Sequence, residues 1–138
     1  MDVNLSNKLS KLIDNGTKRN PLPMVRGNSI RIGKVAVRYS KNKGYILFDC
    51  ESSKQFYVAG SKIGALAVAK VYSVDNDITV VKDYDKEYSK HDNDCVFYEY
   101  TIKNSNNSMK RDLAQVRYEV SKSRRDIASQ KLEAIIFD

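Results

Sequence analysis

Residues that could carry out catalysis are few in this sequence, and their arrangement matches no catalytic motif. His91 is the only histidine, so a Ser-His-Asp or Cys-His arrangement would have to include it. It lies in a polar stretch beside Lys90 and Asp92, with no nucleophile motif nearby. The segment Gly60-Ser61-Lys62 lacks the upstream glycine of a phosphate-binding P-loop. We therefore expect His91 to be a surface histidine and the protein not to be an enzyme.

Acidic residues between positions 83 and 94 match a calcium-binding loop in spacing. Positions 1, 3, 5, 7, 9 and 12 of such a loop would be filled by Asp83, Asp85, Glu87, Ser89, His91 and Asp94. Tyr88, however, stands where the sharp turn requires glycine, and the last ligand is aspartate instead of glutamate. We interpret the stretch as a solvated loop with coincidental spacing, so we expect no metal and no cofactor. The same acids could supply two carboxylates for hydrolysis, but nothing in the sequence selects a pair.

The cysteines and the N-terminus indicate a reducing location. Cys50 and Cys95 lie far apart without metal-ligand spacing, so small buried thiols are favoured over a disulfide. The first residues lack the basic start and apolar core of a secretory signal, and no stretch approaches the ~20 apolar residues of a membrane span. We expect neither secretion by a signal peptide nor a membrane partner, and no small-molecule substrate.

Basic residues and tyrosines gather in the first half of the chain. The formal net charge is +7, and residues 1–76 carry thirteen Lys and Arg against five Asp and Glu. Cations can follow phosphates while aromatic faces stack on bases, which makes a nucleic-acid surface one hypothesis. Its residues would be Lys18, Arg19, Arg26, Arg31, Lys34, Arg38, Tyr39, Lys41, Lys43 and Tyr45. The alternative is that the tyrosines belong to the core or an interface and the lysines keep the sheet soluble.

A three-stranded antiparallel sheet is predicted over residues 30–59. The runs 30–32 and 35–39 change parity across Gly33-Lys34, which predicts a β-bulge near Gly33. Turn residues at 41–44 then lead into a second strand at 45–50, and residues 55–59 form a third.

A small-residue helix follows the sheet, with Ser61 as its N-cap and residues 62–72 as its body. It has almost no polar side, so it should be covered on two sides, by the sheet and by another helix or a partner chain. The partner contacts expected on this helix are Gly64, Ala65, Val68 and Ala69.

The rest of the chain adds a second β-hairpin and a long C-terminal helix. Strands are predicted at 78–81 and 95–103, joined by a polar loop. The helix 108–136 carries a heptad seam that is interrupted by Ser123 and Gln130. Such a seam suits packing on its own domain or pairing with other helices more than a free-standing two-stranded coil. Its partner-binding residues would be Leu113, Val116, Val120, Ile127, Ile136 and Phe137. In front of the sheet we expect an N-terminal helix at 1–15 and a basic, Pro-containing arm or linker at 16–29, which leaves 30–138 as a single α+β domain.

Three stretches make the chain similar to small uncharacterised proteins of tailed bacteriophages. They are the segments 61–70, 93–103 and 132–137. The resemblance implies a phage virion or the infected host cytoplasm as the setting, and it supplies no catalytic residues. The order of elements up to Tyr72, with Gly60-Ser61-Lys62 opening an alanine-containing helix, also resembles the double-stranded-RNA-binding domain, although only Lys62 and Lys70 remain of its cation cluster. The order of three strands and a helix is likewise similar to integrase arm domains.

These observations predict an α+β protein that acts as a non-enzymatic structural or interaction subunit, a virion or assembly component in the phage setting. It would bind partner chains or copies of itself through the C-terminal helix and the N-terminal arm. The alternative function is nucleic-acid binding by the basic, tyrosine-rich sheet.

Overall fold

The computed structural model describes residues 29–137, so the predicted N-terminal helix and all but the last residue of the predicted arm lie outside the described residues. The elements follow the order β1 (Ser29–Ile32), β2 (Val35–Ser40), β3 (Gly44–Asp49), β4 (Lys54–Ala59), α2 (Lys62–Asp75), α3 (Thr79–Asn104) and α4 (Ser108–Phe137). The α+β class and the long C-terminal helix are confirmed. The sheet has four antiparallel strands in the order β1-β2-β3-β4, not three.

The parity change at Gly33 comes from a tight hairpin, and the predicted bulge there was wrong. Ile32 pairs with Val35, so the chain reverses across two residues and both side chains fall on one face. Gly33 has a φ of +60°, which a glycine adopts readily at the first position of a type II′ turn. The bulge that the sheet does contain lies between β3 and β4, at Leu47 and Phe48. The predicted hairpin of β2 and β3 is confirmed by the pairing of Tyr39 with Tyr45.

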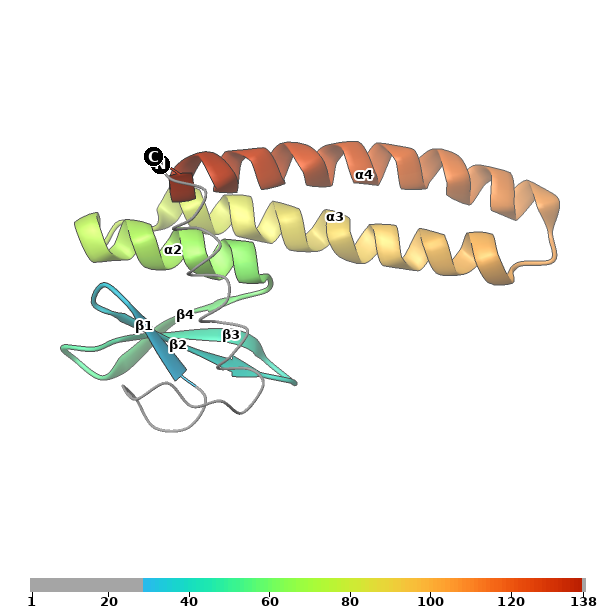
Figure 1. Ribbon diagram of the computed structural model, residues 1–138. Helices are drawn as coiled ribbons and strands as arrows, with labels where there is room; N and C mark the ends of the chain where they lie inside the picture. The colour runs from blue at the N-terminus through green and yellow to red at the C-terminus, as the bar shows by residue number, and fades with distance from the viewer. Residues whose placement is uncertain (1–28, 138) are drawn as a thin grey trace.

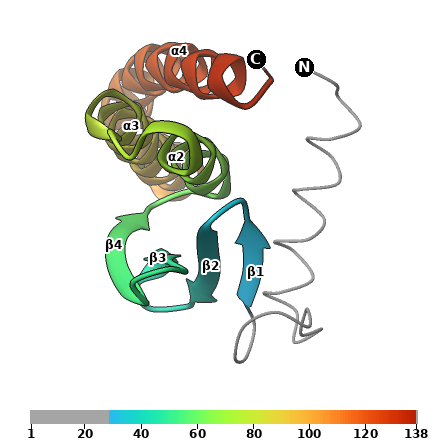
Figure 2. The same cartoon turned by 90° about the vertical axis from the view of Figure 1, so that its left-hand side faces the viewer.

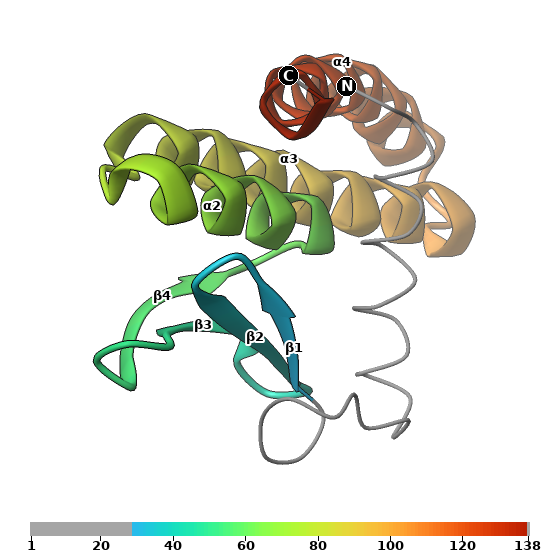
Figure 3. The same ribbon diagram turned by 60° about the vertical axis from the view of Figure 1, so that its left-hand side comes forward.

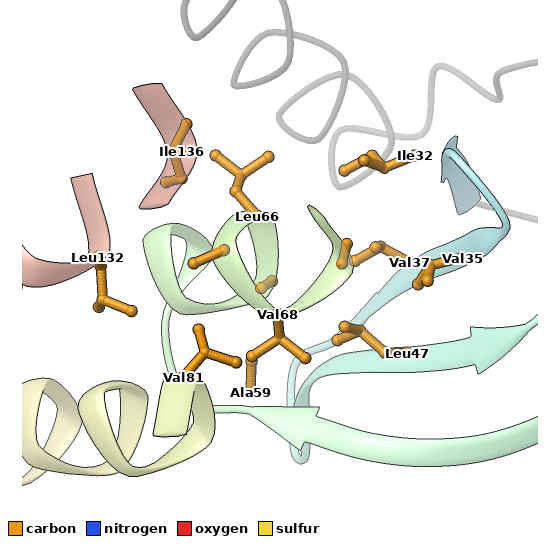
Figure 4. Packing of buried hydrophobic residues seen from close by; sticks show 13 residues of the cluster. Ile32, Val35, Val37, Leu47, Ala59, Leu66, Val68, Val81, Leu132 and Ile136 are labelled. Carbon is orange, nitrogen blue, oxygen red and sulfur yellow. The ribbon is translucent and has the colours of Figure 1, made fainter. Parts of the chain in front are cut away.

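Helix α2 lies between the sheet and the other helices. Ser61 caps it as predicted, because the Ser61 hydroxyl accepts a hydrogen bond from the Gly64 amide at 3.0 Å. Figure 4 shows Val68 directed toward Leu47 of the sheet, while Leu66 is directed toward Ile136 of α4. Both faces of α2 are therefore apolar for the same reason, which is that each is covered by the chain itself.

The predicted strands at 78–81 and 95–103 are wrong, since α3 is one continuous helix through both. The alternation of apolar residues in 95–103 was misleading because Val96 and Tyr100 are exposed, whereas Cys95 is buried. The buried side of α3 repeats at helical spacing and includes Asp85, so a charged residue interrupts the pattern that would have shown the helix. The tertiary contacts of the helix outweigh the strand propensity of its residues.

The helices α3 and α4 form an antiparallel hairpin that projects beyond the sheet (Figure 1). Asn107 caps α4 as its side chain accepts a hydrogen bond from the Lys110 amide at 3.1 Å. Figure 2, which looks along the helices, and the oblique view of Figure 3 show α2 and the start of α3 over the sheet, with α4 as the outermost layer. Helix α4 packs on α2 and α3 and on none of the described strands.

Candidate interaction surface on the helical hairpin

Helix α4 has two apolar faces, and residues 29–137 cover only one of them. The covered face packs on α3 and α2 through Ala114, Ser121, Ala128, Leu132 and Ile136. The heptad seam predicted from the sequence lies on the other face, with Met109, Leu113, Val116, Val120 and Ile127 between 45% and 79% exposed. An exposed row of large apolar side chains of this kind is typical of a surface that binds another protein.

Small residues and polar contacts hold the covered face of α4 to α3. Ala114 and Ala128 are small and buried, which lets α4 approach its neighbours closely. Cys95 of α3 is 1% exposed, and this burial raises the pKa of its thiol. Arg125 donates to Asp92 at 3.1 Å in a partly exposed ion pair. These contacts fix which side of α4 faces outward.

A second exposed apolar group lies on α3, in the half nearer the hairpin tip. Val96, Phe97 and Tyr100 are between 62% and 66% exposed. Val96 lies eleven residues after Asp85, and Tyr100 lies eleven residues after Ser89. Asp85 and Ser89 both face the junction of β4 and α2. Eleven residues are three helical turns, so these side chains continue the same side of α3 about 16 Å further along, where the sheet has ended. They form a second exposed apolar group of the hairpin, separate from the seam of α4.

A shallow groove of about 240 Å³ runs between the helices on the seam side. It is lined by His91, Asp94 and Tyr98 from α3 and by Val116 and Val120 from α4, together with basic residues of both helices. His91 is half-buried here on a helix and does not lie in the polar loop that the sequence predicted. The groove is open, which suits a side chain of a docked helix more than a small molecule.

The predicted partner residues separate into exposed and buried sets. Leu113, Val116, Val120 and Ile127 are exposed together on α4. Gly64, Ala65, Val68 and Ala69 are buried in the core of the chain, so they are not available to a partner. Of the two covers that the sequence left open, another helix or a partner chain, the chain supplies the first. The apolar C-terminal end is also used internally, because Ile136 is buried and Phe137 half-buried.

The acids of the calcium-like spacing lie along α3, and one of them has a structural role that the sequence did not reveal. Asp85 is 1% exposed and accepts hydrogen bonds from the Tyr57 hydroxyl at 2.6 Å, the Gly60 amide at 3.2 Å and the Ser61 hydroxyl at 2.9 Å. Burial, and next the bond to Asp85, raise the pKa of Tyr57 far above its usual value. The carboxylate thereby ties α3 to the junction of β4 and α2. Only the small size of Gly60, Ser61 and Gly64 could have signalled this close approach.

The basic residues of the sheet are divided between separate parts of the surface. The Lys34 ammonium lies over the Tyr72 ring at 5.0 Å, next to α2. The Arg38 guanidinium lies over the Phe48 ring at 5.6 Å on a different side of the strands. Tyr39 and Tyr45 contact each other, with ring centroids 5.0 Å apart, near the exposed Lys41 and Lys43. Arg31 is exposed on β1, and Lys18, Arg19 and Arg26 lie outside the described residues.

Comparison with protein families, with curated proteins and with solved structures gives no match for this chain. Within residues 29–137, no helix is long and apolar enough to cross a membrane, and no group of three His, Cys, Asp or Glu side chains is placed to hold a metal ion.

Proposed function

We propose that this protein is a non-enzymatic interaction subunit that binds protein partners through the exposed face of its helical hairpin. The observation that carries the proposal is the uncovered heptad seam of α4, from Met109 to Ile127, on a helix whose opposite face is fully packed. A folded protein gains free energy by covering such a surface, and a stable partner can cover it without unfolding any part of the domain.

The separation of the molecule into a packed base and a projecting helical hairpin supports the same function. The sheet and α2 form a packed base, and the hairpin projects from it with apolar side chains on two helices (Figure 1). This geometry presents the hairpin to another chain while leaving the core intact. The setting we propose, a phage virion or the host cytoplasm, rests on the resemblance of three segments to small phage proteins.

The proposal is tested by affinity capture with the full-length chain and variants of matched chemistry. Val116→Glu places a charge on the seam, while Val74→Glu places the same charge on the end of α2, where Val74 is 83% exposed and lies outside the hairpin. We expect Val116→Glu and Phe97→Asp to lose the partner chain and Val74→Glu to retain it. Equal capture by all three folded variants would contradict the proposal.

Nucleic-acid binding by the sheet is the second candidate. The arrangement that favours it is the exposed Tyr39 beside Tyr45, with Lys41 and Lys43 in the adjoining turn. Titration of labelled DNA and RNA over a salt series should then give affinity that falls steeply with salt, and a smaller slope for Lys41→Gln/Lys43→Gln. Absence of binding at low salt would exclude this candidate.

A further inference from the structure

We propose that the exposed seam of α4 pairs with the same seam of a second copy of this chain in a parallel, in-register coiled coil. The inference rests on the proposed function and names the partner for one of the two apolar groups. It is carried by the charges that flank the seam, which repeat with the same seven-residue period as the seam itself.

The seam fits a heptad repeat along almost the whole helix. Leu113, Val120, Ile127 and Ala134 occupy one core position, a, and Met109, Val116, Ser123 and Gln130 occupy the other, d. All eight are exposed in the single chain. The repeat extends over about 38 Å of α4, and its first half is entirely apolar. Val120 and Ile127 place β-branched side chains at position a, as two-stranded parallel coiled coils do.

The residues that flank the seam are sorted by charge without exception. The position that follows each d residue, e, is always basic, and it is filled by Lys110, Arg117, Arg124 and Lys131. The position that precedes each a residue, g, is always acidic, and it is filled by Asp112, Glu119, Asp126 and Glu133. All eight of these residues are exposed. One edge of the seam is therefore positive and the other negative over its full length.

This distribution selects both the partner and its direction. In a parallel pair, each g residue lies beside the e residue five positions further along the partner helix, so Glu119 meets Arg124 of the second copy and Asp112 meets its Arg117. In an antiparallel pair, g meets g and e meets e, which sets acid against acid and base against base. A second copy of this chain in parallel orientation is self-complementary, and an antiparallel copy is repelled.

The polar core residues fix the register of the pair. Ser123 and Gln130 face their own counterparts only when the two helices are aligned without a shift. A shift of one heptad would place Gln130 against Ser123 and Ser123 against Val116, which leaves polar groups facing apolar ones. Ser123 and Gln130 therefore lower the affinity between the two helices, and they favour the unshifted alignment over the others.

Within residues 29–137, the seam lies away from the face of α4 that packs on α3 and α2. The face that packs on α3 and α2 includes Ala128 and Leu132, and a residue of the seam such as Ile127 lies about 100° around the helix from Ala128. Two of the charged residues beside the seam also contact groups of their own chain at the surface. The Lys131 ammonium lies 5.1 Å from the centre of the Tyr84 ring, and Asp126 Oδ1 lies 3.6 Å from Arg125 Nε. Arg117 and Arg124 line the groove, and the acidic residues of the partner helix would lie beside them.

Sedimentation equilibrium of the full-length chain tests the pairing. We expect a mass twice the 15.7 kDa of one chain at concentrations up to about 200 µM. The variants Asp112→Lys/Glu119→Lys and Arg117→Glu/Arg124→Glu should each dimerise more than about tenfold more weakly, and an equimolar mixture of the two should form a heterodimer. All substituted residues are exposed, and circular dichroism checks that both variants fold.

A distance measurement tests the direction. A spin label is attached to Asn106→Cys, in the loop at the hairpin tip, with Cys50→Ser and Cys95→Ala removing the native thiols. Parallel pairing brings the two tips together, to within about 30 Å, whereas antiparallel pairing of the 30-residue helices separates them by about 45 Å. A monomer at the highest concentration, a dimer indifferent to the charge variants, or the longer distance would each overturn the inference. If the protein is a monomer but Val116→Glu still abolishes binding of a partner chain, the coiled-coil inference is overturned and the proposed function stands.

Discussion

The carboxylate of Asp85 occupies the space that any side chain on Gly64 would need. A Cβ atom built on Gly64 would lie 1.7 Å from Asp85 Oδ1, which is far inside the contact distance of two atoms. Gly64 sits in the first turn of α2 and Asp85 in the second turn of α3, so this close approach sets the distance between the two helices.

Replacing Gly64 by alanine should therefore destabilise the protein, although alanine is the better helix former. Helix propensity alone would make Gly64→Ala more stable by about 1 kcal/mol. Overpacking against Asp85 should outweigh this gain and lower the free energy of unfolding by about 1–3 kcal/mol. Urea denaturation of the variant measures the sign, and a stabilised variant would show that α3 can move away at little cost.

The hydrogen bonds of Asp85 make a second, separate prediction. Asp85→Asn keeps the shape of the side chain but replaces one acceptor oxygen by a donor NH₂ group, which then faces the donors that the carboxylate accepts from. We expect the free energy of unfolding to fall by about 2–4 kcal/mol, since buried donors lose their partner. Tyr57→Phe removes only one of the donors and should cost less, which provides the control. Equal losses in the two variants would indicate that Tyr57 is the only important partner.

The sequence predicted the parts of the fold that local signals determine. The β2–β3 hairpin, the Ser61 cap and the long C-terminal helix follow from turn residues, a capping serine and a sustained helical period. Helix α3 was missed because its buried side holds Asp85 and its exposed side holds Val96, Phe97 and Tyr100, the reverse of an amphipathic helix. The seam residues of α4 were recognised, but which face the chain would cover depends on α3 and could not be read before α3 was known.

Acid should weaken the contact between Asp49 and Tyr72, which joins the end of β3 to α2. The Tyr72 hydroxyl donates to Asp49 at 2.5 Å, and this bond, followed by that of the Glu51 amide, lowers the pKa of Asp49 below its usual 3.8. Because the folded-state pKa is the lower one, the contact stabilises the fold above about pH 3.8, and the stabilisation is lost as the pH falls through the lowered pKa. The stability difference between the wild type and Tyr72→Phe should thus shrink between pH 7 and pH 3. A difference that is constant with pH would contradict the assignment.

Lys70 should control the fraying of the C-terminal end of α4. Its ammonium donates to the carbonyl oxygens of Ile135 and Ile136 at 2.8 and 3.0 Å, and it thereby caps carbonyls that have no partner within the helix. In Lys70→Met, the stem still covers apolar surface while the charge is gone. We expect faster amide hydrogen exchange over residues 132–137 and a loss of about 1 kcal/mol in the free energy of unfolding. Unchanged exchange in that segment would mean that packing of Leu132 alone holds the end in place.

Two adjacent residues of α4 separate the covered face from the exposed one. Ala128 is 1% exposed and Ile127 is 50% exposed, so they should respond to substitution in opposite ways. Ala128→Leu adds three carbon atoms to a buried side chain in the α3–α4 contact. This overpacking should lower the free energy of unfolding by about 1–3 kcal/mol. Ile127→Ala should leave the unfolding of a dilute, monomeric sample within about 0.5 kcal/mol of the wild type, because an exposed side chain has little packing to lose. At high concentration the same variant should weaken self-association, since the lost side chain belongs to the seam. Thermal unfolding at low and high protein concentration distinguishes the two effects, and a large loss for Ile127→Ala in dilute solution would place the seam inside the fold of the single chain.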